Sequence, residues 1–140
     1  MIQDDFIRLE PFEVKDDIET VLDLIMKSRF TRLTRSEAKN ALLAYPTLFW
    51  KGYDKLTSEF LGVIYLTKYP EHWTLDAYRQ ELTKAIDNNF SYRAGKLISD
   101  YALTLTDKLF TAHSVANRAA TLVCKKLGFK EDFILMRKDR

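Results

Sequence analysis

The spacing of hydrophobic residues alternates between two periods along this chain. Residues 6–12 alternate apolar with polar side chains and reach Pro11, which cannot donate a hydrogen bond to a central ladder, so this stretch predicts a strand. A stripe with helical spacing follows, and its members are Ile18, Val21, Leu22 and Ile25. Asp16 and Asp17 precede the stripe at the positive end of the predicted helix dipole. The chain is therefore predicted to begin with a strand and a helix.

A second helix and a hairpin are predicted next. Thr34 and Glu37 have the spacing of a capping box, and Pro46 limits the helix that they open. Residues 48–53 and 60–67 are rich in aromatic and branched side chains, and the polar segment between them is short. These two strands should therefore pair antiparallel through a hairpin loop.

The middle of the chain adds further strands and another helix. Gly62 has no side chain to pack, which indicates a bulge or a close approach of another backbone. Residues 73–78 predict a strand, as do residues 109–112 and 133–136. Ser91 is the predicted N-cap of the intervening helix. The predicted apolar face of that helix consists of Ala94, Ile98, Tyr101, Ala102 and Leu105.

The most completely specified helix lies near the C-terminus. Its apolar stripe consists of Ala120, Val123, Cys124 and Leu127. Asn117 suits the N-cap, where its side-chain oxygen can accept a hydrogen bond from a free backbone amide. Gly128 can adopt the left-handed conformation that ends a helix, and Phe129 can supply the accompanying hydrophobic contact. Both ends of this helix are therefore predicted from local sequence.

The same segment carries a family resemblance. Asn117, Ala120 and the Leu-Gly-Phe at residues 127–129 resemble the late N-x-x-A-x-x-x-x-x-x-L-G-F motif of the GCN5-related N-acetyltransferases. With the preceding strand and Gly62, the resemblance extends from about Phe6 to the C-terminus. It implies one α/β (α+β) domain over residues 1–140, with a mixed, mostly antiparallel sheet of six or seven strands and about four flanking helices. The order of the strands is not derivable from the sequence.

The resemblance also implies acetyl-coenzyme A as cofactor. In the family, backbone amides of the strand predicted at residues 73–78, here Leu75 and Ala77, pair with pantetheine where two strands splay apart, and Asn117 supports cofactor binding. The family binds pyrophosphate through a Q/R-x-x-G-x-G/A motif at a helix start, and this glycine pattern is absent here. The residues implied instead are Asn88, Asn89, Ser91, Tyr92 and Arg93. The alternative is a capped structural helix without a ligand.

Two residues are predicted to be catalytic. Many family members have a tyrosine seven residues after the asparagine of this motif, and that tyrosine protonates the departing thiolate. Counted from Asn117, Cys124 occupies that position here. Cys124 is either this proton donor or an inert hydrophobic residue, and in the second case Tyr92, Tyr101 or a water would donate. Asp76 is the predicted acceptor of the amine proton, with Glu71 as the nearby alternative.

The other chemical candidates have structural explanations. His72 and His113 flank predicted strands and are predicted to be structural. The two histidines, the single cysteine and the scattered carboxylates show no spacing typical of metal ligands, so no metal site is expected.

Composition narrows the class of protein. A chain of 140 residues with 46% hydrophobic content suits one domain with a proper core. Its 30% charged residues nearly cancel to +2, which provides no strong field for nucleic acid or an anionic membrane. A single cysteine cannot form an internal disulfide, and no long apolar run is present. We therefore expect a soluble cytoplasmic monomer or homodimer.

Two functions follow from these observations. The leading hypothesis is acetyl-coenzyme A-dependent transfer of an acetyl group to an amine acceptor, which is a protein or a small molecule. The alternative is a catalytically silent domain of the same fold that acts as a binding or structural module. The missing glycine pattern and the cysteine at the usual tyrosine position favour the alternative. The small size and divergent motifs also resemble domains of this type encoded by tailed bacteriophages.

Overall fold

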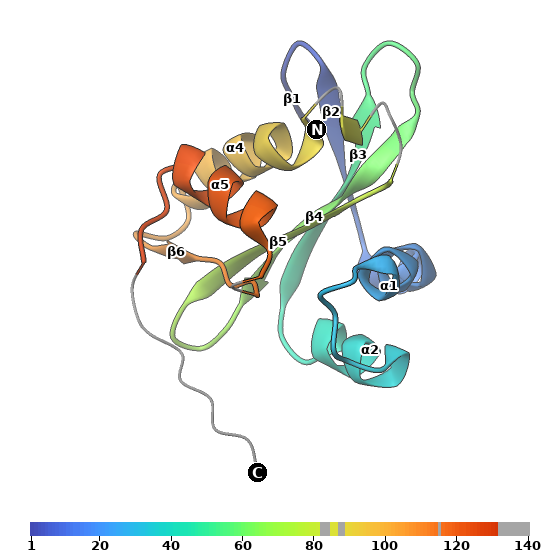
Figure 1. The fold of residues 1–140 in the computed structure, drawn as a ribbon, viewed down its shortest axis with the longest axis vertical. Helices are drawn as coiled ribbons and strands as arrows, with labels where there is room; N and C mark the ends of the chain where they lie inside the picture. The colour runs from blue at the N-terminus through green and yellow to red at the C-terminus, as the bar shows by residue number, and fades with distance from the viewer. Residues whose placement is uncertain (82–84, 87–88, 115, 132–140) are drawn as a thin grey trace.

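The computed structural model of the chain describes residues 1–81, 85–86, 89–114 and 116–131 (Figure 1). The elements are β1 Ile2–Gln3, β2 Ile7–Phe12, the 3-10 helix η1 Val14–Asp16, α1 Ile18–Lys27, α2 Arg35–Leu43, β3 Thr47–Asp54, β4 Phe60–Lys68, β5 Trp73–Arg79, α4 Phe90–Ala102, β6 Leu109–Phe110 and α5 Arg118–Lys126. The strand predicted at residues 133–136 and the candidate Asn88 lie outside the described residues.

The described strands form a six-stranded sheet in the order β1-β2-β3-β4-β5-β6. All neighbouring pairs are antiparallel except β5 and β6, which are parallel. The predicted mixed, mostly antiparallel sheet with four α-helices is therefore confirmed in the described part of the chain. The hairpin predicted between residues 48 and 67 is confirmed as the β3–β4 pair.

The two faces of the sheet carry different helices. Helices α4 and α5 lie on one side and α1 and α2 on the other (Figure 1). The first core joins alternate residues of the strands, such as Leu66 and Leu75, to Ile98 of α4. The second core joins Tyr65 and the other alternate strand residues to Leu22 of α1. Because neighbouring strand residues point to opposite faces, each strand contributes to both cores.

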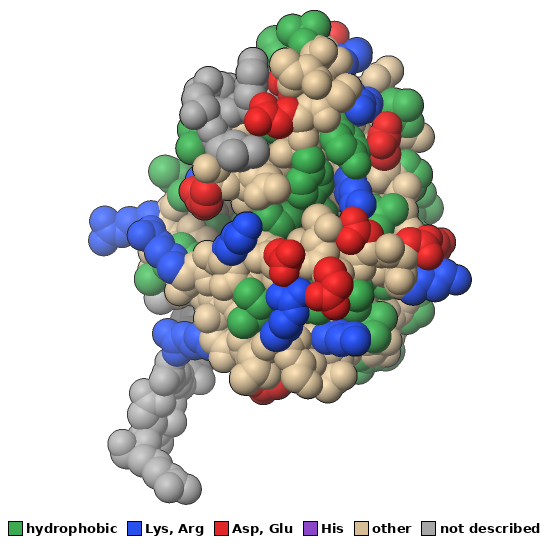
Figure 2. Space-filling model, turned by 90° about the vertical axis from the view of Figure 1, so that its right-hand side faces the viewer, with side chains coloured by type: hydrophobic (Ala, Val, Ile, Leu, Met, Phe, Trp, Pro, Cys, Tyr) green, Lys and Arg blue, Asp and Glu red, His purple; other side chains and the backbone are tan. Residues whose placement is uncertain are grey.

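The N-terminal helices begin as their sequences predict. Asp17 caps α1 by accepting a hydrogen bond from the Thr20 amide (3.4 Å), and its carboxylate also pairs with Lys51 on β3. Thr34 and Glu37 form the predicted capping box of α2. On the face seen in Figure 2, positive and negative side chains are interspersed, and neither sign dominates. None of the helices in the described part of the chain is long and apolar enough to cross a membrane.

Gly62 provides the close approach that the sequence predicted. A Cβ atom at this position would lie 2.4 Å from the Tyr78 carbonyl oxygen and 2.9 Å from the Phe90 ring. Gly62 pairs with Gly52 on β3, where a Cβ atom would lie 2.1 Å from the same ring. The fully buried Phe90 thus packs on two paired glycines and fixes the first turn of α4 against the sheet.

Two details predicted for α4 are wrong. Its N-cap is Asn89 (φ 49°, ψ 52°), and Ser91 is the second residue inside the helix. Tyr101 and Leu105 are exposed. Leu105 lies beyond the end of α4 at Ala102, and the buried face of the helix includes Gly95 and Ser99 in place of Tyr101. The buried residues of α4 are Phe90, Ala94, Gly95, Ile98, Ser99 and Ala102.

Helix α5 has the predicted ends. The Asn117 side chain accepts a hydrogen bond from the Ala120 amide (3.1 Å), and Gly128 adopts φ +89°. The Phe129 amide donates to the Cys124 carbonyl oxygen (3.0 Å), which closes the C-terminal cap. Helix α5 packs close to α4 at Gly95, where a Cβ atom would lie 2.7 Å from Leu127.

Candidate active site

The sheet opens between β5 and β6. These strands pair in only two places, Trp73 with Leu109 and Thr74 with Phe110. The Thr111 hydroxyl then donates a hydrogen bond to the Leu75 carbonyl oxygen (2.9 Å). Beyond this bond no described strand pairs with β5 on that side. The result is a wedge between the two strands, as the family resemblance implied.

Backbone groups of β5 point into this wedge. The Gln80 amide donates to the Leu61 carbonyl oxygen on β4 (2.7 Å), whereas the Leu75 carbonyl oxygen faces β6. Successive residues of a strand direct their N–H and C=O groups to alternate sides, so Ala77 faces the open side together with Leu75. At Ala77 the strand thus presents a backbone donor and an acceptor that pair with no described strand, and an added strand or a peptide-like ligand would bind such groups.

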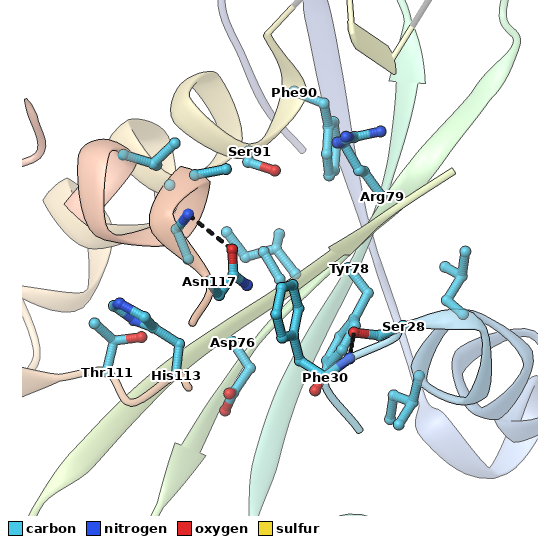
Figure 3. Close-up of a pocket in the computed structure, with 18 of the residues that line it drawn as sticks. Ser28, Phe30, Asp76, Tyr78, Arg79, Phe90, Ser91, Thr111, His113 and Asn117 are labelled. Carbon is cyan, nitrogen blue, oxygen red and sulfur yellow. Dashed lines mark hydrogen bonds between the residues drawn. The ribbon is translucent and has the colours of Figure 1, made fainter. Parts of the chain in front are cut away.

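A cleft of about 1070 Å³ passes through the wedge (Figure 3). One wall is formed by the end of α1 and the loop that follows it, from Leu24 to Leu33. The floor is the C-terminal half of β5, and the opposite wall combines the start of α4, the segment after β6 and one face of α5. Because the cleft reaches both faces of the sheet, two molecules can approach the wedge from opposite sides.

The start of α4 forms one end of the cleft. Asn89 is exposed and left-handed, and its side chain makes no capping hydrogen bond to the described part of the helix. Asn89, Phe90 and Ser91 line the cleft, as does Arg79 at the end of β5. The amides of a helix start and a left-handed residue before them form the type of concavity that binds anions.

Asp76 is the half-buried carboxylate of the cleft. It points to the α1 side of β5, where it lies opposite Tyr65 on β4 and near Tyr78. Burial raises the pKa of Asp76 to about 6. The pKa of Tyr78 is also raised, first by burial and then by the negative charge of Asp76. A carboxylate with such a pKa accepts a proton near neutral pH more readily than an exposed one.

Cys124 and Asn117 line the cleft from α5. Cys124 is half-buried, and burial raises the pKa of its thiol, so the thiol is protonated at neutral pH. This protonation state suits a proton donor and is unsuited to a nucleophile. The Asn117 side-chain oxygen is occupied by its cap bond to Ala120, while the residue itself remains at the cleft wall (Figure 3).

Tyr92 and Arg93 are not among the residues that line the cleft. The Arg93 guanidinium lies over the Phe6 ring at 4.0 Å and pairs with Asp4 at 3.4 Å. Arg93 therefore ties α4 to the N-terminal hairpin. Arg79, at the end of β5, lines the cleft together with the start of α4. The sequence gave no signal for Arg79, because it follows the strand predicted at residues 73–78 and belongs to no motif.

The two histidines have different positions. His72 stacks with Tyr69 at 5.1 Å and meets Phe110 edge-on at 5.4 Å, away from the cleft lining. His113 lines the cleft, and its Nε2 lies 2.9 Å from the Thr121 hydroxyl, which itself donates to the Asn117 carbonyl oxygen. Glu71 is exposed and does not line the cleft. The sequence also gave no sign that Tyr78 and Phe30 would meet at the cleft.

No family model and no curated protein matches this sequence, whereas solved structures match its fold closely. An acetyltransferase from Agrobacterium tumefaciens superposes with a TM-score of 0.68 at 18% identity, covering 99% of this chain and 89% of its own. A GNAT-family acetyltransferase from Bacillus anthracis gives 0.64 at 16% identity, covering 94% and 84%. An aminoglycoside 6′-N-acetyltransferase from Acinetobacter baumannii gives 0.64 at 11% identity, covering 96% and 98%.

These similarities define the class of fold. The chain has the GCN5-related N-acetyltransferase fold over essentially its whole length. At such low identity the similarity shows the fold alone. The reaction and its acceptor depend on the residues of the cleft.

Proposed function

We propose that this protein transfers the acetyl group of acetyl-coenzyme A to an amine. The observation that supports it best is the wedge itself, in which the backbone groups of Leu75 and Ala77 face a cleft between β5 and α5. Pantetheine contains two amide groups in an extended chain and can pair with β5 as an added strand. Ala77 is exposed and small, which leaves room for such a chain beside the strand.

The cofactor pyrophosphate would bind at the start of α4. Asn89 and Ser91 would provide amides there, Asn88 belongs to the same proposed segment, and the helix dipole favours an anion at this end. Arg79 would supply the positive charge, since it lines this end of the cleft and its carboxylate partner Glu81 is exposed (3.5 Å), whereas Arg93 lies outside the cleft lining and pairs with Asp4. Asn117 would support the pantetheine side of the cleft from the first turn of α5.

The acetyl-coenzyme A thioester supplies an activated acetyl group. The amine nitrogen forms a bond to the carbonyl carbon as the carbon–sulfur bond breaks. Asp76 accepts the proton that the amine loses, because its raised pKa matches this task. Cys124 lies on the α5 wall and donates a proton to the departing sulfur, which leaves as a thiol. The proton on Asp76 and the thiolate of Cys124 then re-equilibrate through solvent.

A second function is favoured by one specific observation. Arg93 occupies the helix turn where the family resemblance implied a phosphate ligand, yet its side chain binds Asp4 and Phe6. With the glycine pattern also absent, the fold could serve as a silent binding or structural module. The two functions differ in whether the wedge binds coenzyme A.

Titration calorimetry with coenzyme A tests the proposal directly. We expect saturable binding, with weaker binding in Arg79→Ala because one charge near the pyrophosphate is removed. Arg118→Ala is the matched control, since Arg118 is exposed on α5 and does not line the cleft. No heat at millimolar coenzyme A would reject the transferase and leave the silent module.

A further inference from the structure

The loop from Ser28 to Leu33 carries two arginines that pair with no carboxylate of the described residues, and its side of the wedge, away from the proposed cofactor site, is here called the acceptor side. It lines the cleft on the face of α1, which is also the face to which Asp76 points. The proposed cofactor site lies on the opposite face, at α4 and α5. A molecule that enters past this loop would therefore meet Asp76 without crossing the cofactor.

The loop has a defined shape. The Thr31 hydroxyl donates to the Ile25 carbonyl oxygen (2.8 Å), and the Thr31 amide donates to the Ser28 carbonyl oxygen (3.2 Å). The Phe30 amide also donates to the Ser28 hydroxyl (3.4 Å; Figure 3). These bonds form a turn directly after the end of α1, so the backbone that carries Arg29 and Arg32 is held by hydrogen bonds.

Of the positive side chains in this segment, one is paired and three have no ion pair with a described carboxylate. Arg35 pairs with Glu19 and with Asp23 (2.9 Å). These two α1 carboxylates, which lie about two turns and one turn before the end of the helix, therefore already have a cationic partner. No ion pair joins Lys27, Arg29 or Arg32 to a carboxylate of the described residues, although the Arg29 guanidinium lies 4.9 Å from the centre of the Phe30 ring.

The described lining of the cleft is thus asymmetric in charge. Its cations are Lys27, Arg29, Arg32 and Arg79, and its carboxylates are Asp76 and Glu81. Glu81 already pairs with Arg79 (3.5 Å). Among the described residues, the acceptor side therefore has three cations without a carboxylate partner around a single carboxylate. A polycationic amine would be repelled there, because like charges on a cleft wall suppress the wrong partner.

We propose that the acceptor is an amine whose own molecule carries an anionic group, a carboxylate or a phosphate, that binds Arg29 and Arg32 while the amine faces Asp76. This inference rests on the proposed acetyl transfer at the same cleft. It separates this chain from its structural neighbour named as an aminoglycoside acetyltransferase, whose named acceptor class carries several amino groups.

Pairs of amines that differ only in the anion test this assignment. The probes are 4-aminobutyrate with 4-aminobutyramide, O-phosphoethanolamine with ethanolamine, and spermidine as the polycation. We expect kcat/KM to be about tenfold higher for the anionic member of at least one pair at low salt, and to decline as salt is raised. The carboxylate and phosphate pairs distinguish the two possible anions. A preference for spermidine or for the neutral members would overturn the inference.

A charge-reversal pair assigns the effect to the loop. In Arg29→Glu/Arg32→Glu the preference for the anionic amine should disappear or reverse, while the coenzyme A dissociation constant stays unchanged. Lys15→Glu/Lys39→Glu is the matched control, because it changes the net charge equally at exposed positions outside the cleft lining. A preference that survives in the loop variant would contradict the inference.

Direct binding of the same amines, followed by NMR without coenzyme A, keeps the two proposals separate. Tighter binding of the anionic members supports the acceptor class even where no acetyl transfer is detected. Equal binding within each pair rejects the acceptor class, and the coenzyme A titration judges the transferase independently.

Discussion

Asp76 shows how a single residue acquires chemistry from its position. An aspartate on a strand is usually a solvated surface group, yet here the side chain is half-buried between Tyr65 and Tyr78 at the mouth of the wedge. Burial disfavours the charged form and raises the pKa to about 6. The family resemblance predicted Asp76 near the reaction, but its burial depends on the tertiary structure, in which Tyr65 of the neighbouring strand lies opposite it.

Replacement of Asp76 by asparagine should change both activity and the pH dependence of stability. Wild-type kcat/KM should rise with pH around a midpoint near 6, and Asp76→Asn should lower it about 10²-fold. The folded protein binds the Asp76 proton more tightly than the unfolded chain, so this group makes stability fall as pH rises from about 4 to 6, by up to about 3 kcal/mol. Asp76→Asn should remove that decline in urea unfolding.

Glu71→Gln is the control for this prediction, because Glu71 is the exposed carboxylate at the start of the same strand region. It should leave the pH–rate profile and the stability profile unchanged. An unchanged profile in Asp76→Asn, or a loss of activity in Glu71→Gln, would remove Asp76 from the proposed role.

Cys124 offers a second test at the residue scale. As the proton donor to the departing sulfur, its replacement by alanine should lower kcat about 10²-fold without changing the affinity for coenzyme A. The stability cost should be modest, because α5 has no fully buried residue among those described. Steady-state turnover and calorimetry of the same preparations measure both quantities.

The control for Cys124 is Leu122→Ala on the exposed side of α5. This variant should keep wild-type turnover. Equal turnover in Cys124→Ala and wild type would show that the thiol is an inert hydrophobic contact, which is the alternative that the sequence left open.

At the scale of elements, α5 and α4 contrast in how their ends are specified. The N-cap of α5 and its glycine stop are local, and both are present as predicted. Helix α4 begins one residue after a left-handed Asn89, because Phe90 is held by Gly52 and Gly62 on distant strands. Local sequence favours Ser91 as the cap, but Ser91 lies inside the helix.

Strand β5 carries the prediction that belongs to this scale. Ala77→Pro removes a backbone N–H that faces the wedge and leaves the ladder to β4 intact, as proline is tolerated where the N–H has no strand partner. We expect coenzyme A affinity to fall at least tenfold with little change in melting temperature. Calorimetry and thermal unfolding measure the two effects.

Ala77→Gly is the matched control, since it keeps the N–H while changing the side chain. It should retain most of the affinity. Wild-type affinity in Ala77→Pro would rule out pairing of the cofactor with β5 through this amide.

At the scale of the whole molecule, the cleft exists because two hydrophobic cores pack on the two faces of one sheet, and this sheet opens between β5 and β6. The α4 core and the α1–α2 core hold β5 from both faces, while β6 pairs with it at only two positions. The opening is therefore maintained by packing on both sides of β5. A ligand in the wedge would bridge β5 and α5, which line the same cleft.

Coenzyme A binding should consequently stabilise the whole fold. A ligand at about 100 times its dissociation constant adds roughly 2.7 kcal/mol to the free energy of unfolding. For a chain of this size that corresponds to a rise in melting temperature of roughly 8 °C. A thermal shift series against ligand concentration measures it, and an unchanged melting temperature at saturation would contradict binding to the native state.

The sequence by itself determined the elements whose signals are local. The capping box at Thr34, the cap at Asn117 and the stop at Gly128 follow from neighbouring residues, since hydrogen bonds and φ preferences within a few residues decide them. The strands at residues 7–12, 47–54, 60–68 and 73–79 were predicted from their local side-chain pattern, whereas β1 was not predicted. Only the tertiary structure decided which side chains reach the cleft. The Arg93 side chain pairs with Asp4 and Arg79 lines the cleft, because side-chain direction depends on the packing of segments that are distant in sequence.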